Sequence, residues 1–136
     1  MMVIEFLLAI LVLAAIFMAV IMVTHKRRSG LDAEYYKKAW TQIINYVGSG
    51  ESGWRLAIID ADKLLDHALK QAGAGGETMG ERLRDRQATF THYNQLWSAH
   101  KLRNRIVHEP NVRLSKMITQ QALQEFKRAL KQLGAL

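Results

Sequence analysis

The segment GWRLAIIDADKLLDHALKQA, residues 53–72, has the most regular apolar pattern in the chain and decides its fold class. Its apolar residues recur every three or four positions, which places them on one face of an α-helix. They are Trp54, Ala57, Ile58, Ala61, Leu64, Leu65, Ala68, Leu69 and Ala72. A helix with so continuous an apolar face needs other helices around it, so we expect this segment to be the central, most buried helix of a bundle.

Helical spacing also precedes the central segment. Residues 32–47 form an amphipathic pattern, and the glycines at 48 and 50 are expected to end that helix. Ser52 is the expected N-cap of the central helix, because a serine oxygen can accept a hydrogen bond from a free N–H group of the first turn.

Three more helices are expected after the central segment. Thr78 and Glu81 have the spacing of a capping box, so a short helix should follow the glycine-rich loop at 73–76. A motif helix capped by Thr91 should follow, and a last helix should start near Ser115 or Thr119. The sequence has no strand pattern, so residues 31–136 are predicted to be an all-α bundle of four or five helices.

The N-terminal segment differs from the rest, because residues 6–23 are an unbroken run of 18 apolar residues. As a helix this run is about 27 Å long, close to the roughly 30 Å of a bilayer core. A cleaved signal peptide fits less well, since the cations follow the run and Glu5 precedes it. We therefore expect a retained transmembrane anchor at residues 1–24.

Cations gather directly after the anchor, in a juxtamembrane linker at residues 25–30. Lys26, Arg27 and Arg28 favour the cytoplasmic side by the positive-inside rule. The expected protein is therefore single-pass in the cell (inner) membrane, with its N-terminus outside and its C-terminal domain in the cytoplasm.

The charge balance suggests anionic partners. All 19 Lys and Arg residues follow the anchor, with 11 of the 12 acidic residues, so this part of the chain carries 19 − 11 = +8. In one interpretation the linker cations, with Lys37 and Lys38, rest on lipid headgroups. In the other, the domain attracts RNA or another polyanion, and the two are compatible. The chain has no cysteine, which excludes a disulfide scaffold.

Residues 102–110, LRNRIVHEP, contain the strongest functional signal. They end a helix expected at about residues 92–108, since Pro110 disfavours helix at the position before it. Along one stripe of this helix, apolar residues give way to His100, Arg103, Asn104 and His108. A buried polar group without partners costs about 1 to 3 kcal/mol, so we expect this stripe to face a subunit, a ligand or a wet groove.

The spacing R-N-x-x-x-H of Arg103, Asn104 and His108 resembles the signature of HEPN domains, which are small four- or five-helix bundles. The resemblance extends to residues 31–136 in organisation only, and its specific part is this segment. Many catalytic HEPN proteins are metal-independent RNA endonucleases in which two copies of the motif meet across a dimer interface. The resemblance therefore implies a homodimer and an endoribonuclease, without a cofactor or a metal site.

The residue types suit that chemistry. A free imidazole titrates near pH 6.5, so His108 could act as general base or acid. Arg103 would hold the phosphate with its fixed fork of donors, and Asn104 would orient the substrate or His108. The two outer residues are about 140° apart on the helix, so we expect them to flank a groove.

Other residues are weaker candidates. His100 is either a supporting group or a satisfied histidine at a helix interface, and Asp60 is a candidate ion partner of Arg103. The remaining polar residues of the central helix, Asp62, Asp66 and His67, are expected on a mostly solvated face, where Asp66 and Lys70 have favourable i,i+4 spacing.

A basic patch is expected on the short helix and beside the motif. Arg82, Arg84, Arg86 and Arg105 could contact a phosphate backbone, or they could simply form a soluble surface.

A purely structural role for the motif stays open. Arg103 and Asn104 could bind backbone carbonyls or Glu109, with His108 stabilising the helix C-terminus. The alternative function is accordingly a noncatalytic, membrane-tethered module for dimerisation, RNA binding or another interaction. Its partner would be an unidentified cytoplasmic or membrane protein.

Overall fold

The structure is a computed structural model that describes residues 1–27 and 30–136, without the side chains of Met2 and of residues 23–27. The chain divides into two compact units, Met1–Gly30 and Leu31–Leu136. The first contains one helix, α1 (Met2–Arg27), whose segment Val3–Met22 is long and apolar enough to cross a membrane. The proposed headgroup contacts of Lys26, Arg27 and Arg28 lie outside the described residues.

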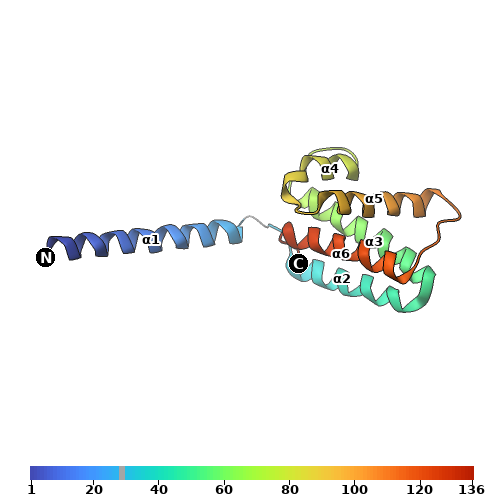
Figure 1. Ribbon diagram of the computed structural model, residues 1–136, viewed down its shortest axis with the longest axis horizontal. Helices are drawn as coiled ribbons and strands as arrows, with labels where there is room; N and C mark the ends of the chain where they lie inside the picture. Colours follow the sequence, from blue (N-terminus) through green and yellow to red (C-terminus); the bar gives the residue numbers. More distant parts are fainter. Residues whose placement is uncertain (28–29) are drawn as a thin grey trace. The chain divides into compact units, whose positions relative to one another are not determined.

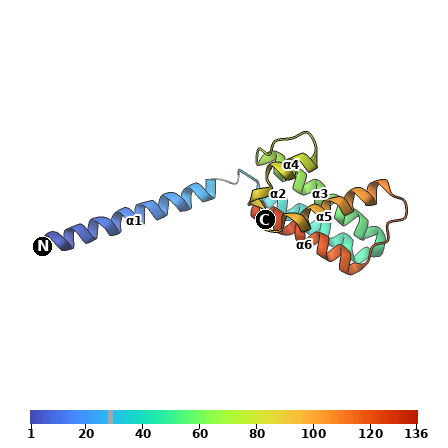
Figure 2. The same ribbon diagram turned by 45° about the horizontal axis from the view of Figure 1, so that its top comes forward.

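The second unit is all helical in its described residues. Its main helices are α2 (Ala33–Tyr46), α3 (Gly50–Gln71), α4 (Met79–Asp85), α5 (Tyr93–His108) and α6 (Lys116–Gln132). Two short 3₁₀ turns, Val47–Ser49 and Gln87–Thr89, link α2 to α3 and α4 to α5. Figures 1 and 2 show α5 and α6 side by side, with short α4 at one end of the bundle near the start of α5.

Helix α3 is central, as its apolar pattern predicts. It contacts α2, α4, α5 and α6, and no other helix of the described unit contacts as many. The fully buried residues of α3 come from the predicted apolar face: Ala57, Ile58, Ala61, Leu65, Ala68 and Leu69. Phe126 and Leu130 of α6 are also fully buried, so the core lies mainly between α3 and α6.

Several helix boundaries follow from local capping chemistry. The Asp32 carboxylate accepts hydrogen bonds from two backbone N–H groups at the start of α2, and the Ser115 hydroxyl accepts one from the Ile118 N–H group at the start of α6. Thr78 and Glu81 form the predicted capping box of α4. Hydrogen bonds from the backbone N–H groups of Thr78 and Glu77 lower the pKa of Glu81 below its usual value.

Two predicted caps are wrong. Helix α3 begins at Gly50, so Ser52 lies inside it, and the turn is held by a hydrogen bond from the Trp54 indole to the Val47 carbonyl. Thr91 does not cap α5, because the helix begins at Tyr93 with His92 at its N-cap; the Thr91 hydroxyl accepts a hydrogen bond from Gln132 of α6. In both places, contacts between helices prevail over the local capping preference.

Candidate functional site

The motif residues Arg103, Asn104 and His108 lie on the C-terminal half of α5, beyond the part that α4 covers. Near the start of α5, Tyr93 and Trp97 stack with ring centroids 6.0 Å apart. Gly80 of α4 packs so closely that a Cβ there would lie 3.3 Å from the Trp97 ring and 3.8 Å from His100 Nε2. The stripe is therefore covered at its apolar end and becomes more exposed towards Asn104 and His108.

Four polar side chains form a closed ring between α3 and α5, which we call the polar ring: Asp62, His100, Asn104 and Arg103. Asp62 Oδ1 lies 2.8 Å from His100 Nδ1, and His100 Nε2 lies 3.2 Å from Asn104 Nδ2. Arg103 Nη1 donates to Asn104 Oδ1 over 3.0 Å, and Arg103 Nε closes the ring 3.4 Å from Asp62 Oδ2. Asp62 and His100 are 2 % and 6 % exposed, so most of this ring is shielded from water.

The direction of each hydrogen bond in the polar ring follows from Arg103. A guanidinium has donors only, so the group that faces it must be the oxygen of the Asn104 amide. The amide nitrogen then donates to His100 Nε2, which must carry no proton. The remaining imidazole proton is on Nδ1 and is donated to Asp62. His100 is therefore a neutral imidazole of one defined tautomer.

Arg103 is fixed on two sides and open on the third. Its side chain is 24 % exposed, and its buried Nε faces Asp62 as an ion pair without hydrogen-bond geometry. Within the described part of the chain, Nη2 of this guanidinium has no hydrogen-bond partner. An oriented guanidinium with a free N–H edge can bind one oxygen of an incoming anion.

His108 is the last residue of α5 and is exposed. No other described residue forms a hydrogen bond or ion pair with its imidazole. It lies about 7.5 Å beyond Arg103 along the helix axis, at 1.5 Å per residue. The imidazole is therefore free to meet a ligand or a second protein surface.

Glu109, the C-cap residue of α5, pairs with Arg105 over 3.3 Å, and both side chains are exposed. Within the described residues, neither forms a hydrogen bond or ion pair with the polar ring. The predicted alternative in which Glu109 holds Arg103 is therefore wrong.

Asp60 is not the partner of Arg103, contrary to the prediction. It pairs with Lys63 at 3.6 Å and lines a small pocket of about 200 Å³ between α2 and α3. Residues 60 and 62 are about 200° apart on a helix, so they face different neighbours. The carboxylate that meets Arg103 is Asp62, which was expected on the solvated face.

Asp62 could have been found from its spacing. It lies four residues after Ile58, three before Leu65 and seven before Leu69. All three of these apolar residues are fully buried in the core. These intervals place Asp62 on their face of α3. Sequence reasoning missed Asp62 because it assigned Asp60 to the border of the apolar stripe and left Asp62 on the solvated face.

The predicted basic patch on α4 is divided by structural contacts. Arg82 is buried, with Nε 2.7 Å from Asp66 and Nη1 donating to the Gly76 carbonyl, so the prediction of a phosphate contact is wrong here. Arg86 donates to the Ala72 carbonyl. Arg84 is exposed and stacks over Trp97 at 5.7 Å from the ring centroid.

Asp66 joins α3 to α4 through these cations. Its carboxylate is also 2.7 Å from Lys70, which confirms the predicted i,i+4 pair. Burial acts to raise the pKa of Asp66, but hydrogen bonds from Arg82 and Lys70 outweigh it and lower the pKa below its usual value.

A second polar pair joins α2 to α3. The Tyr36 hydroxyl and His67 Nδ1 share a hydrogen bond of 2.8 Å. Burial, together with Tyr35 and Asp32, raises the pKa of the Tyr36 phenol, which therefore stays protonated at neutral pH.

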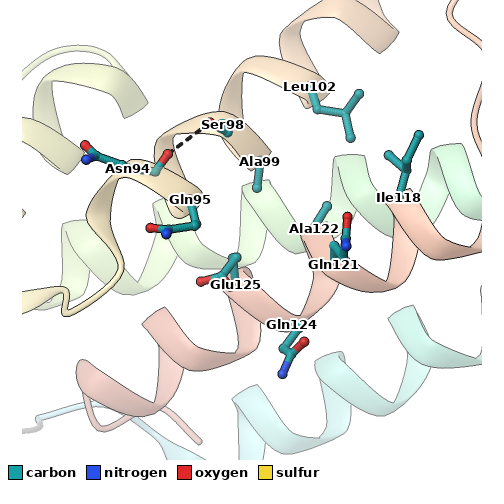
Figure 3. Close-up of a pocket in the computed structure, with 10 residues that line it drawn as sticks. All are labelled: Asn94, Gln95, Ser98, Ala99, Leu102, Ile118, Gln121, Ala122, Gln124 and Glu125. Atoms are coloured by element: carbon teal, nitrogen blue, oxygen red, sulfur yellow. Dashed lines mark hydrogen bonds between the residues drawn. The ribbon is translucent and has the colours of Figure 1, made fainter.

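A groove of about 740 Å³ lies elsewhere, between α5 and α6. Figure 3 shows Ala99 and Ala122 between the two helices and polar side chains such as Gln95, Gln121 and Glu125 around them. None of the motif residues lines this groove. The predicted groove between Arg103 and His108 is therefore distinct from this one and stays a prediction.

No three His, Asp or Glu side chains in the described residues are grouped as metal ligands would be. Comparison with protein-family models, curated proteins and solved structures finds no match for this chain. We therefore infer the function from the geometry of the polar ring and His108, together with the motif resemblance.

Proposed function

We propose that this chain is a membrane-anchored, metal-independent endoribonuclease that uses Arg103, Asn104 and His108. The supporting observation is the state of Arg103: Asp62 and Asn104 hold its guanidinium, and one N–H edge stays free. His108, five residues later on the same helix, is exposed and has no partner in the described residues. An aligned cation and a free imidazole within two helical turns suit a phosphodiester and its neighbouring ribose.

In the proposed reaction, the ribose 2′-oxygen attacks the adjacent phosphorus, and the bond from phosphorus to the 5′-oxygen breaks. A base takes the 2′-hydroxyl proton and an acid protonates the leaving 5′-oxygen, giving a 2′,3′-cyclic phosphate and a 5′-hydroxyl end. Arg103 stabilises the negative charge that develops on the phosphoryl oxygens.

Two proton-transfer groups are needed, and each chain offers one accessible imidazole at the motif. We therefore propose a homodimer in which His108 of each copy serves the shared site. In this arrangement one imidazole acts as base and the other as acid.

The membrane setting of the proposal depends on α1. Its segment Val3–Met22 has the length and composition to cross a bilayer, and the cations that follow it favour the cytoplasmic side. We propose that the bundle lies at the cytoplasmic face, where it meets RNA near the membrane or a membrane-bound partner.

Orientation can be tested directly because the chain has no cysteine. A Ser52→Cys variant places one thiol on the exposed start of α3. In intact cells an impermeant maleimide should leave this thiol unlabelled and should label it after lysis. Labelling of intact cells would refute the cytoplasmic assignment.

One observation favours a second function, a noncatalytic RNA-binding or interaction module. Arg103 and Asn104 both take part in the polar ring, which fastens α5 to α3. This use alone would explain two of the three motif residues, and only His108 has no structural task in the described contacts.

The deciding experiment incubates the full chain, in mild detergent, with mixed RNA and an excess of a metal chelator. Cleavage that persists with chelator and is lost in His108→Ala supports the enzyme. His92→Ala is the matched control, since His92 is also an exposed histidine at an end of α5. Intact RNA in every sample, with RNA retained by wild type but not by Arg103→Ala, supports the binding module.

A further inference from the structure

We propose that Asp62 and His100 are positioning residues for the phosphate site, and that they fix the Asn104 amide and, through it, the free edge of Arg103. This inference rests on the proposed function, in which Arg103 holds the phosphodiester. It assigns a role to two buried residues outside the R-N-x-x-x-H motif.

Asp62 is the anchor of this arrangement. Each of its carboxylate oxygens faces a different group, with Oδ1 at 2.8 Å from His100 and Oδ2 at 3.4 Å from Arg103. The residue is 2 % exposed, so water offers little competition for either contact. One buried anion therefore holds both the imidazole proton and the guanidinium.

His100 transmits the position of that anion to Asn104. Because the Nδ1 proton is directed at Asp62, Nε2 carries no proton and can act only as a hydrogen-bond acceptor. The NH₂ group of Asn104 must therefore face it. The amide oxygen is then directed at Arg103 Nη1. If the amide were reversed, its NH₂ group would oppose the guanidinium, and two donors would meet.

The imidazole has little freedom to leave this position. Trp97 lies against it with ring centroids 5.7 Å apart, and α4 packs so near that a Cβ at Gly80 would lie 3.8 Å from His100 Nε2 and 3.3 Å from the Trp97 ring. The orientation of Arg103 is thus set by packing on α4 and by the charge on α3. Both lie outside the helix that carries the motif.

Asp62→Asn removes the charge while keeping the shape. A carboxamide has one oxygen, so it can accept from His100 or face Arg103, but it presents an NH₂ group to the other. Asp60→Asn is the matched control, because it changes the same residue type two positions away on a carboxylate that pairs with exposed Lys63.

The first measurement needs no variant. In ¹⁵N-labelled full-length chain in detergent micelles, imidazole ¹⁵N shifts should show His100 with the proton on Nδ1. A proton on Nε2 would overturn the proposal, because Asn104 could not then donate to that atom. This measurement can overturn the proposal even if Asp62→Asn fails to fold.

The second measurement is affinity for a single-stranded RNA whose 2′-hydroxyls are methylated, so that it binds without being cleaved. Asp62→Asn should bind about tenfold more weakly or worse than wild type, the loss expected when one charge-assisted hydrogen bond is misaligned. Asp60→Asn should bind like wild type. The affinities are measured well below the unfolding temperature of each variant. If Asp62 had a purely structural role, Asp62→Asn would have a lower Tm but an unchanged affinity for RNA. That result would overturn the proposal.

Different results would refute the proposed ribonuclease function and the positioning role of Asp62 and His100. Wild-type chain that neither binds nor cleaves RNA would refute the proposed function and the positioning role with it. Wild-type chain that cleaves RNA, beside an equally active, folded Asp62→Asn, would refute the positioning role alone.

Discussion

Replacing Arg82 by methionine should destabilise the bundle strongly, although a surface arginine is usually replaceable. The Arg82 side chain is 7 % exposed and bridges α4 to α3 through Asp66 and to the preceding loop through the Gly76 carbonyl. Methionine keeps the apolar stem and removes the charge, so the change isolates these polar contacts.

The size of the stability loss depends on the partners that Asp66 keeps when Arg82 is removed. Breaking a buried ion pair by removing one partner costs about 3 to 5 kcal/mol. Asp66 keeps Lys70 at 2.7 Å and its side chain is 18 % exposed, so the lower end applies, about 3 kcal/mol. For a unit of this size, that corresponds to a fall in Tm of about 12 °C.

Tryptophan fluorescence of the full chain in detergent can measure this change. All three tryptophans, Trp40, Trp54 and Trp97, lie in the unit Leu31–Leu136, so the signal reports the unfolding of the bundle and not of α1. Arg84→Met is the control: Arg84 is exposed and its cation–π contact is worth about 1 kcal/mol or less.

The dependence on pH provides a second check. The pKa of Asp66 is lowered in the folded state, so its stabilising effect is complete above the unfolded-state pKa, about 3.9, and is lost as the pH falls through the folded-state value. The difference in stability between wild type and Arg82→Met should therefore narrow below about pH 4. Equal losses for Arg82→Met and Arg84→Met at neutral pH would refute the reasoning.

Three further changes test the packing and capping of the bundle. Gly53→Ala should lower the free energy of unfolding by about 3 kcal/mol in a denaturant titration, since a Cβ there would meet the Tyr46 carbonyl oxygen. Gly48→Ala is the control: a Cβ at Gly48 meets nothing, so the same titration should show little change. Thr78→Ala should cost about 1 kcal/mol through loss of the α4 cap, and an unchanged Tm would contradict this. Tyr36→Phe should cost about 1 kcal/mol by chemical denaturation, because the phenol hydrogen bond joining α2 to α3 is lost.

The helices and the core could be predicted because apolar spacing determines them. The face of α3 that the sequence marks as apolar is the face that α2, α5 and α6 cover. The capping box at Thr78 and the cap at Ser115 were also predictable, since each depends on residues three apart or fewer.

The contacts of the site could be predicted only in part. The stripe from Trp97 to Asn104 was recognisable, but its partner Asp62 is 38 residues from His100, and sequence spacing within α5 carries no information on which carboxylate of α3 it meets. Arg82 was misassigned for a similar reason: its burial depends on how α4 packs against α3, which a short basic segment does not reveal. Long-range pairing of charges thus marked the limit of prediction from sequence.

The polar ring has a consequence for how the domain would meet a polyanion. Its one carboxylate and one guanidinium cancel, and its imidazole is neutral, so the ring exerts almost no field at a distance. Capture from solution must then depend on cations elsewhere on the chain, and added salt should slow it. The alignment of a ligand already bound at the polar ring should scarcely respond to ionic strength. Salt should therefore affect the rate of association but not the orientation of the bound ligand.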